Sequence, residues 1–160
     1  MKHTLSVLLQ NKPGALSRVT GLFSGRGFNI ESLCVAETIE PKVSCLTLVT
    51  RGEDAIIEQI TKQLHKLIDV IKVNDISEGE YVEREMVLIR VRAEAQTRAE
   101  VLRVIDIFRG KVVDVSPNSY AVEITGPESK IKAVIDILRP IGIKEIIRTG
   151  TIAMPRAPKK

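Results

Sequence analysis

The sequence predicts an α+β fold in which one order of elements, βαββαβ, occurs twice. The chain has 160 residues, a length that fits one ordinary domain or two unusually small ones. It contains 20 Ile and 17 Val but only 5 aromatic residues. Because β-branched residues fit a pleated, half-buried surface, this composition favours a large share of sheet. The same order of predicted elements recurs in each half, so two small domains are expected.

A strand, a tight turn and a helix open the chain. The apolar run at residues 4–10 predicts a strand, and the Asn-Lys-Pro-Gly sequence at residues 11–14 is a strong turn signal. Residues 15–25 then show helical spacing of apolar side chains, and glycines close the helix. The apolar positions of this helix are Leu16, Val19 and Phe23.

A hairpin, a second helix and a last strand complete the first half. Residues 28–38 and 43–50 predict two strands joined by a turn at residues 40–42. Glu53 and Asp54 place acidic side chains at a helix start, where the helix dipole favours them. A strand at residues 70–76 ends this half. The buried face of the helix consists of Ile56, Ile57, Ile60, Leu64 and Leu67.

The second half repeats the pattern. A strand at residues 85–93 alternates arginines with aliphatic residues, and Thr97 with Glu100 forms a capping box that predicts the next helix, closed by Gly110. Pro127 fits the first turn of the last helix. The remaining predicted strands are residues 111–115, 120–125 and 144–152.

Each βαββαβ half predicts a ferredoxin-like domain, with a four-stranded antiparallel sheet and both helices on one face. The predicted first domain spans residues 1–77, a polar linker residues 78–83, the second domain residues 84–153, and a flexible tail residues 154–160. A domain of this size buries only about 60% of its unfolded surface. The uncovered sheet face and the sheet edges therefore favour dimerisation.

Composition excludes several classes of protein. The net charge of +4 is interspersed along the chain, and five aromatic residues leave little for base stacking, so no nucleic-acid partner is expected. An RNA-recognition module shares the βαββαβ order, but its third strand carries aromatic residues and residues 43–50 have none. No apolar run approaches the roughly 20 residues of a membrane span, and no signal peptide is recognised. Cys34 and Cys45 are interpreted as apolar filler in a reducing compartment, so the expected location is the cytoplasm.

No constellation of catalytic or metal-binding residues is evident. Hydrolase, metalloprotease, EF-hand and P-loop motifs are missing from the sequence. His65 stands among lysines on a predicted helix and is interpreted as solvated, while Glu83 and Glu85 are interpreted as surface acids. The glycines at 21, 25 and 27 lie at a helix end, where a pyrophosphate would meet the unfavourable pole of the dipole.

One loop carries binding chemistry. Residues 11–15 join a strand to a helix N-terminus, whose free N–H groups and dipole favour an anion such as a carboxylate. Gly14 allows close approach of the backbone, and Asn11 offers a donor and an acceptor. Asn29 adds a second amide beside Ile30. This mixture suits an aliphatic amino acid, although a plain turn without a ligand explains the same residues.

Five short motifs resemble one family. Residues 11–19 (NKPGALSRV) and 26–33 (RGFNIESL) resemble the ACT domain of the acetolactate synthase (acetohydroxyacid synthase) small subunit. Residues 82–85 (VERE), 108–115 (FRGKVVDV) and 148–150 (RTG) resemble the second domain of that subunit. The resemblance covers essentially the whole chain and implies an N-terminal ACT domain followed by a C-terminal small-subunit domain.

The resemblance implies a regulatory subunit without a catalytic site. Members of this family activate a catalytic large subunit that uses thiamine diphosphate, Mg and FAD to condense pyruvate with pyruvate or 2-oxobutyrate, so no cofactor is expected in this chain. They confer feedback inhibition by valine, and in some members by leucine or isoleucine. Their ACT domains pair, which implies a homodimeric effector site. Its implied residues are Asn11, Gly14, Ala15 and Leu16 from one chain, with Asn29 and Ile30 from the partner chain.

One alternative stays open at this point. An autonomous ACT-type protein could sense amino acids without a large subunit. Such a protein would be expected to carry a helix-turn-helix, and none is recognised in the sequence.

Overall fold

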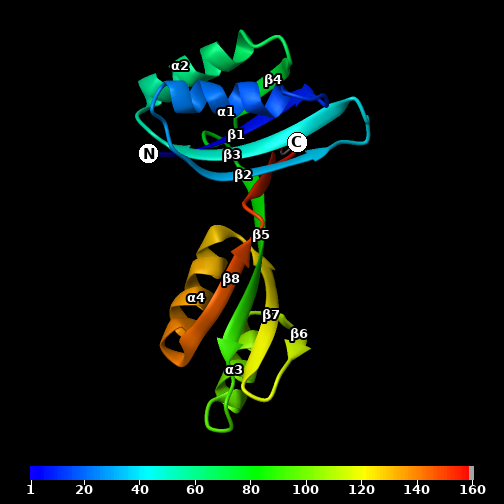
Figure 1. Ribbon diagram of the computed structural model, residues 1–160. Coiled ribbons are helices and arrows are strands. Elements are labelled where there is room, and N and C mark those ends of the chain that lie inside the picture. The colour runs from blue at the N-terminus through cyan, green and yellow to red at the C-terminus, as the bar shows by residue number, and fades with distance from the viewer. Residues whose placement is uncertain (159–160) are drawn as a thin grey trace. The chain divides into compact units, whose positions relative to one another are not determined.

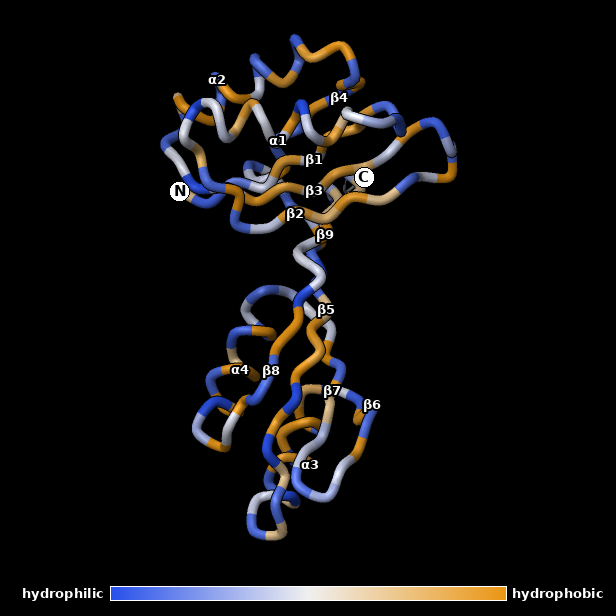
Figure 2. The backbone as a smooth tube through the Cα atoms, in the orientation of Figure 1, coloured by the Kyte–Doolittle hydropathy of each residue, from blue (hydrophilic) through white to orange (hydrophobic). Residues whose placement is uncertain are grey.

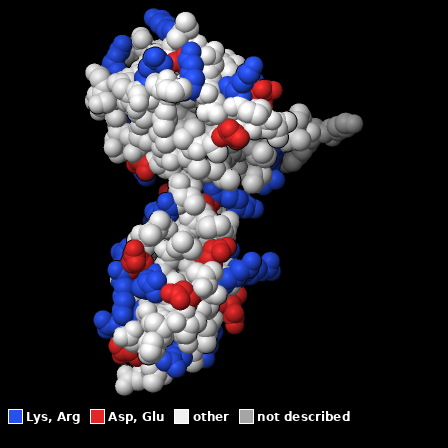
Figure 3. Space-filling view, turned by 45° about the vertical axis from the view of Figure 1, so that its right-hand side comes forward, with Lys and Arg blue, Asp and Glu red and all other residues white. Residues whose placement is uncertain are grey.

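The computed structural model describes residues 1–158, which form two compact units. The first unit comprises Met1–Val82 together with the segment that begins at Thr151, and the second comprises Glu83–Gly150. Charged side chains of both signs are interspersed over the surface in view in Figure 3. No helix among residues 1–158 is long and apolar enough to cross a membrane.

The first unit has the predicted ferredoxin-like order. Its strands lie in the order β2-β3-β1-β4, and every neighbouring pair is antiparallel. Both helices lie on one face of this sheet (Figure 1). The elements are β1 (Lys2–Gln10), α1 (Ala15–Gly25), β2 (Ile30–Glu37), β3 (Val43–Arg51), α2 (Asp54–His65) and β4 (Val70–Asp75).

The core of the first unit lies between the helices and the sheet. Alternate residues of β1 and β3 face the helices, as the register that pairs Leu5 with Leu48 requires. Figure 2 shows the apolar residues concentrated along these strands. The fully buried members of this core include Leu5, Val7, Phe23, Leu46, Leu48 and Leu64. The apolar side chains that recur with helical spacing in α1 and α2 therefore face this core.

The opposite face of this sheet is covered in part by the same chain. Thr4, Thr47 and Val49 point away from the helices and are nevertheless buried. The segment from Thr151 belongs to this unit, and its first N–H donates to Ser32 Oγ on that face at 2.9 Å. From the sequence, this face is expected to be polar or to be covered by a partner. In the structure, the segment of the same chain that begins at Thr151 returns to it. Cys34 and Cys45 are free and half-buried.

The second unit has the same topology. Its strands lie in the order β6-β7-β5-β8, which confirms the predicted α+β class with two ferredoxin-like sheets. Val87, Ile89 and Val91 are fully buried while Arg90 and Arg92 point to the other face, as the alternation predicts. The elements are β5 (Tyr81–Arg92), α3 (Arg98–Ile107), β6 (Lys111–Val115), β7 (Ser119–Gly126), α4 (Glu128–Gly142) and β8 (Ile143–Arg148).

The structure divides the chain differently from the predicted boundaries at residues 77, 83 and 153. Strand β5 begins at Tyr81, so the second half of the predicted linker 78–83 is strand. The predicted strand 144–152 ends at Arg148, because Gly150 adopts a φ of 84° that breaks the extended backbone. A further strand, β9 (Ile152–Pro155), then pairs with β5, so the first residues of the predicted tail 154–160 are ordered.

The predicted capping box at the start of α3 does not form. Thr97 is the N-cap residue, but its hydroxyl is buried without a hydrogen-bond partner among the described residues. Its φ of −112° and ψ of −10° place it in the helical region. A capping side chain reaches the first-turn N–H groups from the extended region, so this backbone conformation explains the missing bond.

Candidate functional site

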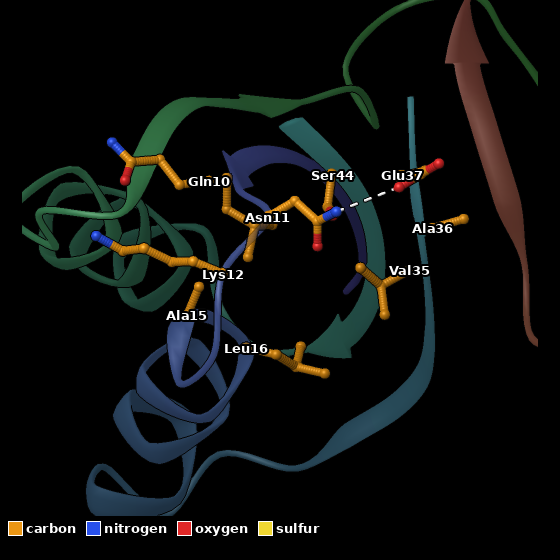
Figure 4. Close-up of a pocket in the computed structure, with 10 residues that line it drawn as sticks. Gln10, Asn11, Lys12, Ala15, Leu16, Val35, Ala36, Glu37 and Ser44 are labelled. Atoms are coloured by element: carbon orange, nitrogen blue, oxygen red, sulfur yellow. Dashed lines mark hydrogen bonds between the residues drawn. The ribbon is translucent and has the colours of Figure 1, made fainter. Parts of the chain in front are cut away.

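The predicted binding loop between β1 and α1 forms one wall of a pocket of about 240 Å³ (Figure 4). Of the loop residues predicted for the effector site, Asn11, Ala15 and Leu16 line this pocket and Gly14 does not. The other wall comes from β2 and β3, which the sequence did not connect with the loop. Those residues are Val35, Ala36, Glu37 and Ser44.

Gly14 sets the conformation of the loop. It is the N-cap residue of α1 and has a φ of 85° and a ψ of −14°, a left-handed conformation that favours glycine. The N–H of Ala15 donates to the carbonyl of Lys12 at 3.3 Å, and the next N–H groups of the first turn have no acceptor within the helix. No side chain caps this end of α1. The loop therefore presents backbone donors at the positive pole of the helix dipole, next to the pocket.

Asn11 is fixed against the β2–β3 hairpin. Its Nδ2 donates to the carbonyl of Pro41 at 2.9 Å and to Glu37 Oε2 at 3.3 Å, and its N–H donates to the carbonyl of Lys42 at 2.8 Å. Figure 4 shows the contact between Asn11 and Glu37 across the pocket. The amide donors are thus used within the chain. Its Oδ1 and the Glu37 carboxylate are acceptors suited to an ammonium group.

Asn29 and Ile30 do not line this pocket. They lie at the start of β2, at the other end of the strand from Glu37. The carbonyl of Asn29 accepts a hydrogen bond from Thr50 Oγ1 at 2.7 Å, and Ile30 pairs with Thr50 in the sheet. The predicted contribution of these two residues comes from a second chain, so their place in the site stays a prediction.

A buried carboxylate that sequence reasoning missed lies behind the loop. Asp69, in the turn between α2 and β4, is 1% exposed and holds two cations from the loop and α1. Lys12 Nζ lies 2.7 Å from its Oδ1, and Arg18 Nη1 contacts its Oδ2. The hydrogen bond from Lys12, aided by the charge of Arg18, lowers the pKa of Asp69 below its ordinary value. No local pattern in residues 66–70 marks this position, so the sequence carried no signal for it.

Two motifs of the second unit meet in an ion pair. Arg148 donates from Nε to Glu85 Oε1 at 2.6 Å and from Nη2 to Glu85 Oε2 at 2.7 Å. Glu85 is 4% exposed, so the prediction of a surface acid is wrong for this residue, because the pairing allows its burial. The hydrogen bonds that Arg148 donates to Glu85 raise the pKa of Arg148. Glu83 Oε1 accepts the N–H of Glu128 at the start of α4.

The other candidate residues show no catalytic arrangement. His65 lies with Lys62 and Lys66 along the wall of an open depression on α2. Within residues 1–158, no group of three His, Cys, Asp or Glu side chains is placed to hold a metal ion. The pocket beside residues 11–16 is thus the site whose residues combine anion-binding backbone, polar acceptors and aliphatic walls.

Comparison with known proteins points to a single family. Residues 84–157 match the family described as the small subunit of acetolactate synthase, and residues 5–72 match the AHAS small subunit-like ACT domain. The chain is 52% identical over 160 residues to the probable acetolactate synthase small subunit of Archaeoglobus fulgidus, covering 100% of both chains. It is 51% identical to the acetolactate synthase small subunit of Haemophilus influenzae, over 99% of this chain and 98% of that protein.

A solved structure agrees with these sequence matches. The crystal structure of the acetolactate synthase small subunit from Thermotoga maritima superposes with a TM-score of 0.90 at 43% sequence identity. The alignment covers 99% of each chain. The similarity therefore extends over both units and not over one domain alone.

Proposed function

This chain belongs to the family of acetolactate synthase small subunits, and we propose that it is a regulatory subunit that activates a catalytic large subunit and makes it sensitive to valine. Full-length similarity to proteins named as small subunits supports the partnership. The large subunit would hold thiamine diphosphate, Mg and FAD and carry out the transferase chemistry. The complex is expected in the cytoplasm.

The single observation that carries the effector proposal is the chemistry of the pocket beside Gly14. The effector carboxylate would accept hydrogen bonds from the N–H groups of residues 14 and 16, since that of Ala15 already donates to Lys12, and the helix dipole favours a negative charge there. The ammonium group would face Asn11 Oδ1 and the Glu37 carboxylate. Leu16 and Val35 would pack against the branched aliphatic side chain. At about 240 Å³ the pocket suits a single small amino acid.

A second copy of the chain would complete the site. Strand β2 lies at an edge of its sheet, where unpaired backbone groups are available for another strand. Pairing of two first units would bring Asn29 and Ile30 of one chain toward the loop of the other. An effector that contacts both chains stabilises the dimer arrangement that it binds.

Inhibition requires that valine prefer one state of the complex. A ligand shifts an equilibrium only by its difference in affinity between two states. Feedback regulation needs about 1–3 kcal/mol of such coupling, a common allosteric value. The state favoured by valine would be the one in which the large subunit is less active.

A mixing assay tests the proposal. The purified chain is added to purified large subunit, and acetolactate formation is measured with and without valine. The proposal expects a higher rate on addition of the chain and a fall in that rate as valine is added. A chain that binds valine but leaves the large subunit unaffected would support the autonomous sensor instead, and the absence of both effects would overturn the proposal.

A further inference from the structure

Asp69 is a buried carboxylate outside the pocket, and it holds the two residues that flank Gly14. Lys12 precedes Gly14 by two positions and Arg18 lies one helical turn beyond it. The side chains of Lys12 and Arg18 are 48% and 51% exposed, whereas that of Asp69 is 1% exposed. An ionised carboxylate buried to this degree is costly unless it is paired. The two cations therefore remain bound to Asp69.

The same residue also anchors the backbone that enters the loop. The carbonyl of Asp69 accepts the N–H of Gln10, the last residue of β1, at 2.8 Å. The guanidinium of Arg18, held by Asp69, lies 3.4 to 3.6 Å from the position that a Cβ on Gly14 would occupy. Asp69 thus fixes the loop at its start through Gln10, within it through Lys12, and after it through Arg18.

From this geometry we infer that Asp69 is a positioning residue for effector binding, acting through Lys12 and Arg18 on the conformation of residues 11–16. The inference rests on the proposed function, since it assumes that the pocket beside Gly14 takes an amino acid. Asp69 does not line the pocket. Its role is to hold the first-turn N–H groups in the direction of the effector carboxylate, so that less conformational freedom is lost on binding.

The charge of Asp69 and its positioning role predict opposite changes in the affinity for valine when Asp69 loses its charge. Lys12, Arg18 and Asp69 together carry one net positive charge. Asp69→Asn would leave two cations beside the loop, and through charge alone a carboxylate would bind more tightly. Through positioning it would bind more weakly, because Asn pairs poorly with two cations and the loop is released. The sign of the change therefore separates the two roles.

The experiment compares the full chain and its Asp69→Asn variant, each mixed with large subunit. The valine concentration for half inhibition and the rate without valine are measured for both, and valine binding is measured by calorimetry. The expected result is a half-inhibition concentration raised about tenfold or more, with the rate without valine within about twofold of the unmodified chain. Asp69→Glu keeps the charge and is expected to recover part of the sensitivity.

Asp75→Asn is the matched control. Asp75 is a partly buried carboxylate on β4 of the same unit. It pairs with His3 Nδ1 at 2.9 Å and accepts the N–H of Ser77, and neither partner belongs to the loop. The same chemical change there is expected to leave valine sensitivity unchanged. An equal loss in both variants would show a general effect of destabilisation and would overturn the positioning role.

A second variant decides the matter if Asp69→Asn does not fold. Arg18→Met removes one partner with a half-exposed side chain, and it is expected to raise the half-inhibition concentration severalfold while the rate without valine is retained. If the half-inhibition concentration in these variants is unchanged or lower, the positioning role of Asp69 is overturned and the proposed function still stands. An unmodified chain that shows no valine response overturns the proposed function and this inference together.

Discussion

Arg148 donates two hydrogen bonds to the carboxylate of Glu85, and these bonds join β8 to β5 inside the second unit. The two residues are 63 positions apart in the chain, and each belongs to a different motif of the sequence. Thr149, next to Arg148, adds a hydrogen bond from the N–H of Met86 to its Oγ1 at 3.1 Å. The two motifs therefore form one structural junction.

Loss of the carboxylate at Glu85 is expected to destabilise the protein. Glu85→Gln leaves a buried polar group with weaker bonds to Arg148, and hydrogen bonds to charged groups contribute about 1.5–3 kcal/mol. The free energy of unfolding, measured with chemical denaturant, should fall by about that amount. Glu94→Gln is the control, because Glu94 is exposed and its Oε1 lies 3.8 Å from Arg92 Nε, a longer and more solvated ion pair. Equal stability of the two variants would contradict a structural role for the junction.

A charge at Gly14 is expected to abolish valine inhibition while activation of the large subunit is retained. In Gly14→Asp, the added carboxylate would lie beside the proposed position of the effector carboxylate and repel it. Asp tolerates the left-handed backbone of this residue better than most side chains, so the unit should still fold. The assay is acetolactate formation over a range of valine concentrations.

Gly79→Asp provides the comparison for that variant. A Cβ at Gly79 meets no atom within 4 Å, so the same charge is added without a clash and outside the pocket. Valine sensitivity should match that of the unmodified chain. If Gly14→Asp behaved in the same way, the site would have to lie elsewhere.

Acid should weaken the contribution of Asp69 to stability. Its pKa in the folded chain is lowered from 3.8, chiefly by the hydrogen bond from Lys12, so the ionised form is stabilised by folding. This contribution is complete above the ordinary pKa of 3.8 and is lost as the pH falls through the lower folded pKa. Unfolding free energies from neutral pH to about pH 2 should therefore show the unmodified chain and Asp69→Asn converging at the acid end. A gap between the curves that stays constant with pH would argue against this ion pair.

Removal of the returning C-terminal segment should uncover part of the outer face of the first unit's sheet. A chain that ends at Gly150 loses β9 and the hydrogen bond from Thr151 to Ser32. Val49 would then regain solvent contact, and burial of one such side chain is worth about 2 kcal/mol. A lower thermal midpoint and increased self-association in light scattering are expected.

A chain that ends at Arg156 tests whether the effect comes from β9. It retains the strand and the hydrogen bond from the N–H of Arg156 to the carbonyl of Glu80 at 2.8 Å. Its thermal midpoint should equal that of the full chain. A midpoint as low as in the shorter chain would assign the stabilisation to the last residues instead.

Local patterns in the sequence determined the elements and the loop. The turn at residues 11–14, the apolar spacing in 15–25 and the alternation in 85–93 each involve neighbouring residues, so they predict helices and strands without knowledge of the fold. The loop chemistry and the family motifs likewise led to Asn11, Ala15 and Leu16, which do line the pocket. The capping box at Thr97 failed because a motif fixes residue types and not the backbone angles that they adopt.

Only the tertiary structure decided which distant residues meet. Arg18 and Asp69 are 51 positions apart, and Ser32 and Thr151 are 119 apart. Such pairs are brought together by strand order and by the return of the chain, and no local spacing encodes them. The buried charges at Asp69 and Glu85 follow the same rule, because a carboxylate tolerates burial only where the fold supplies a cation.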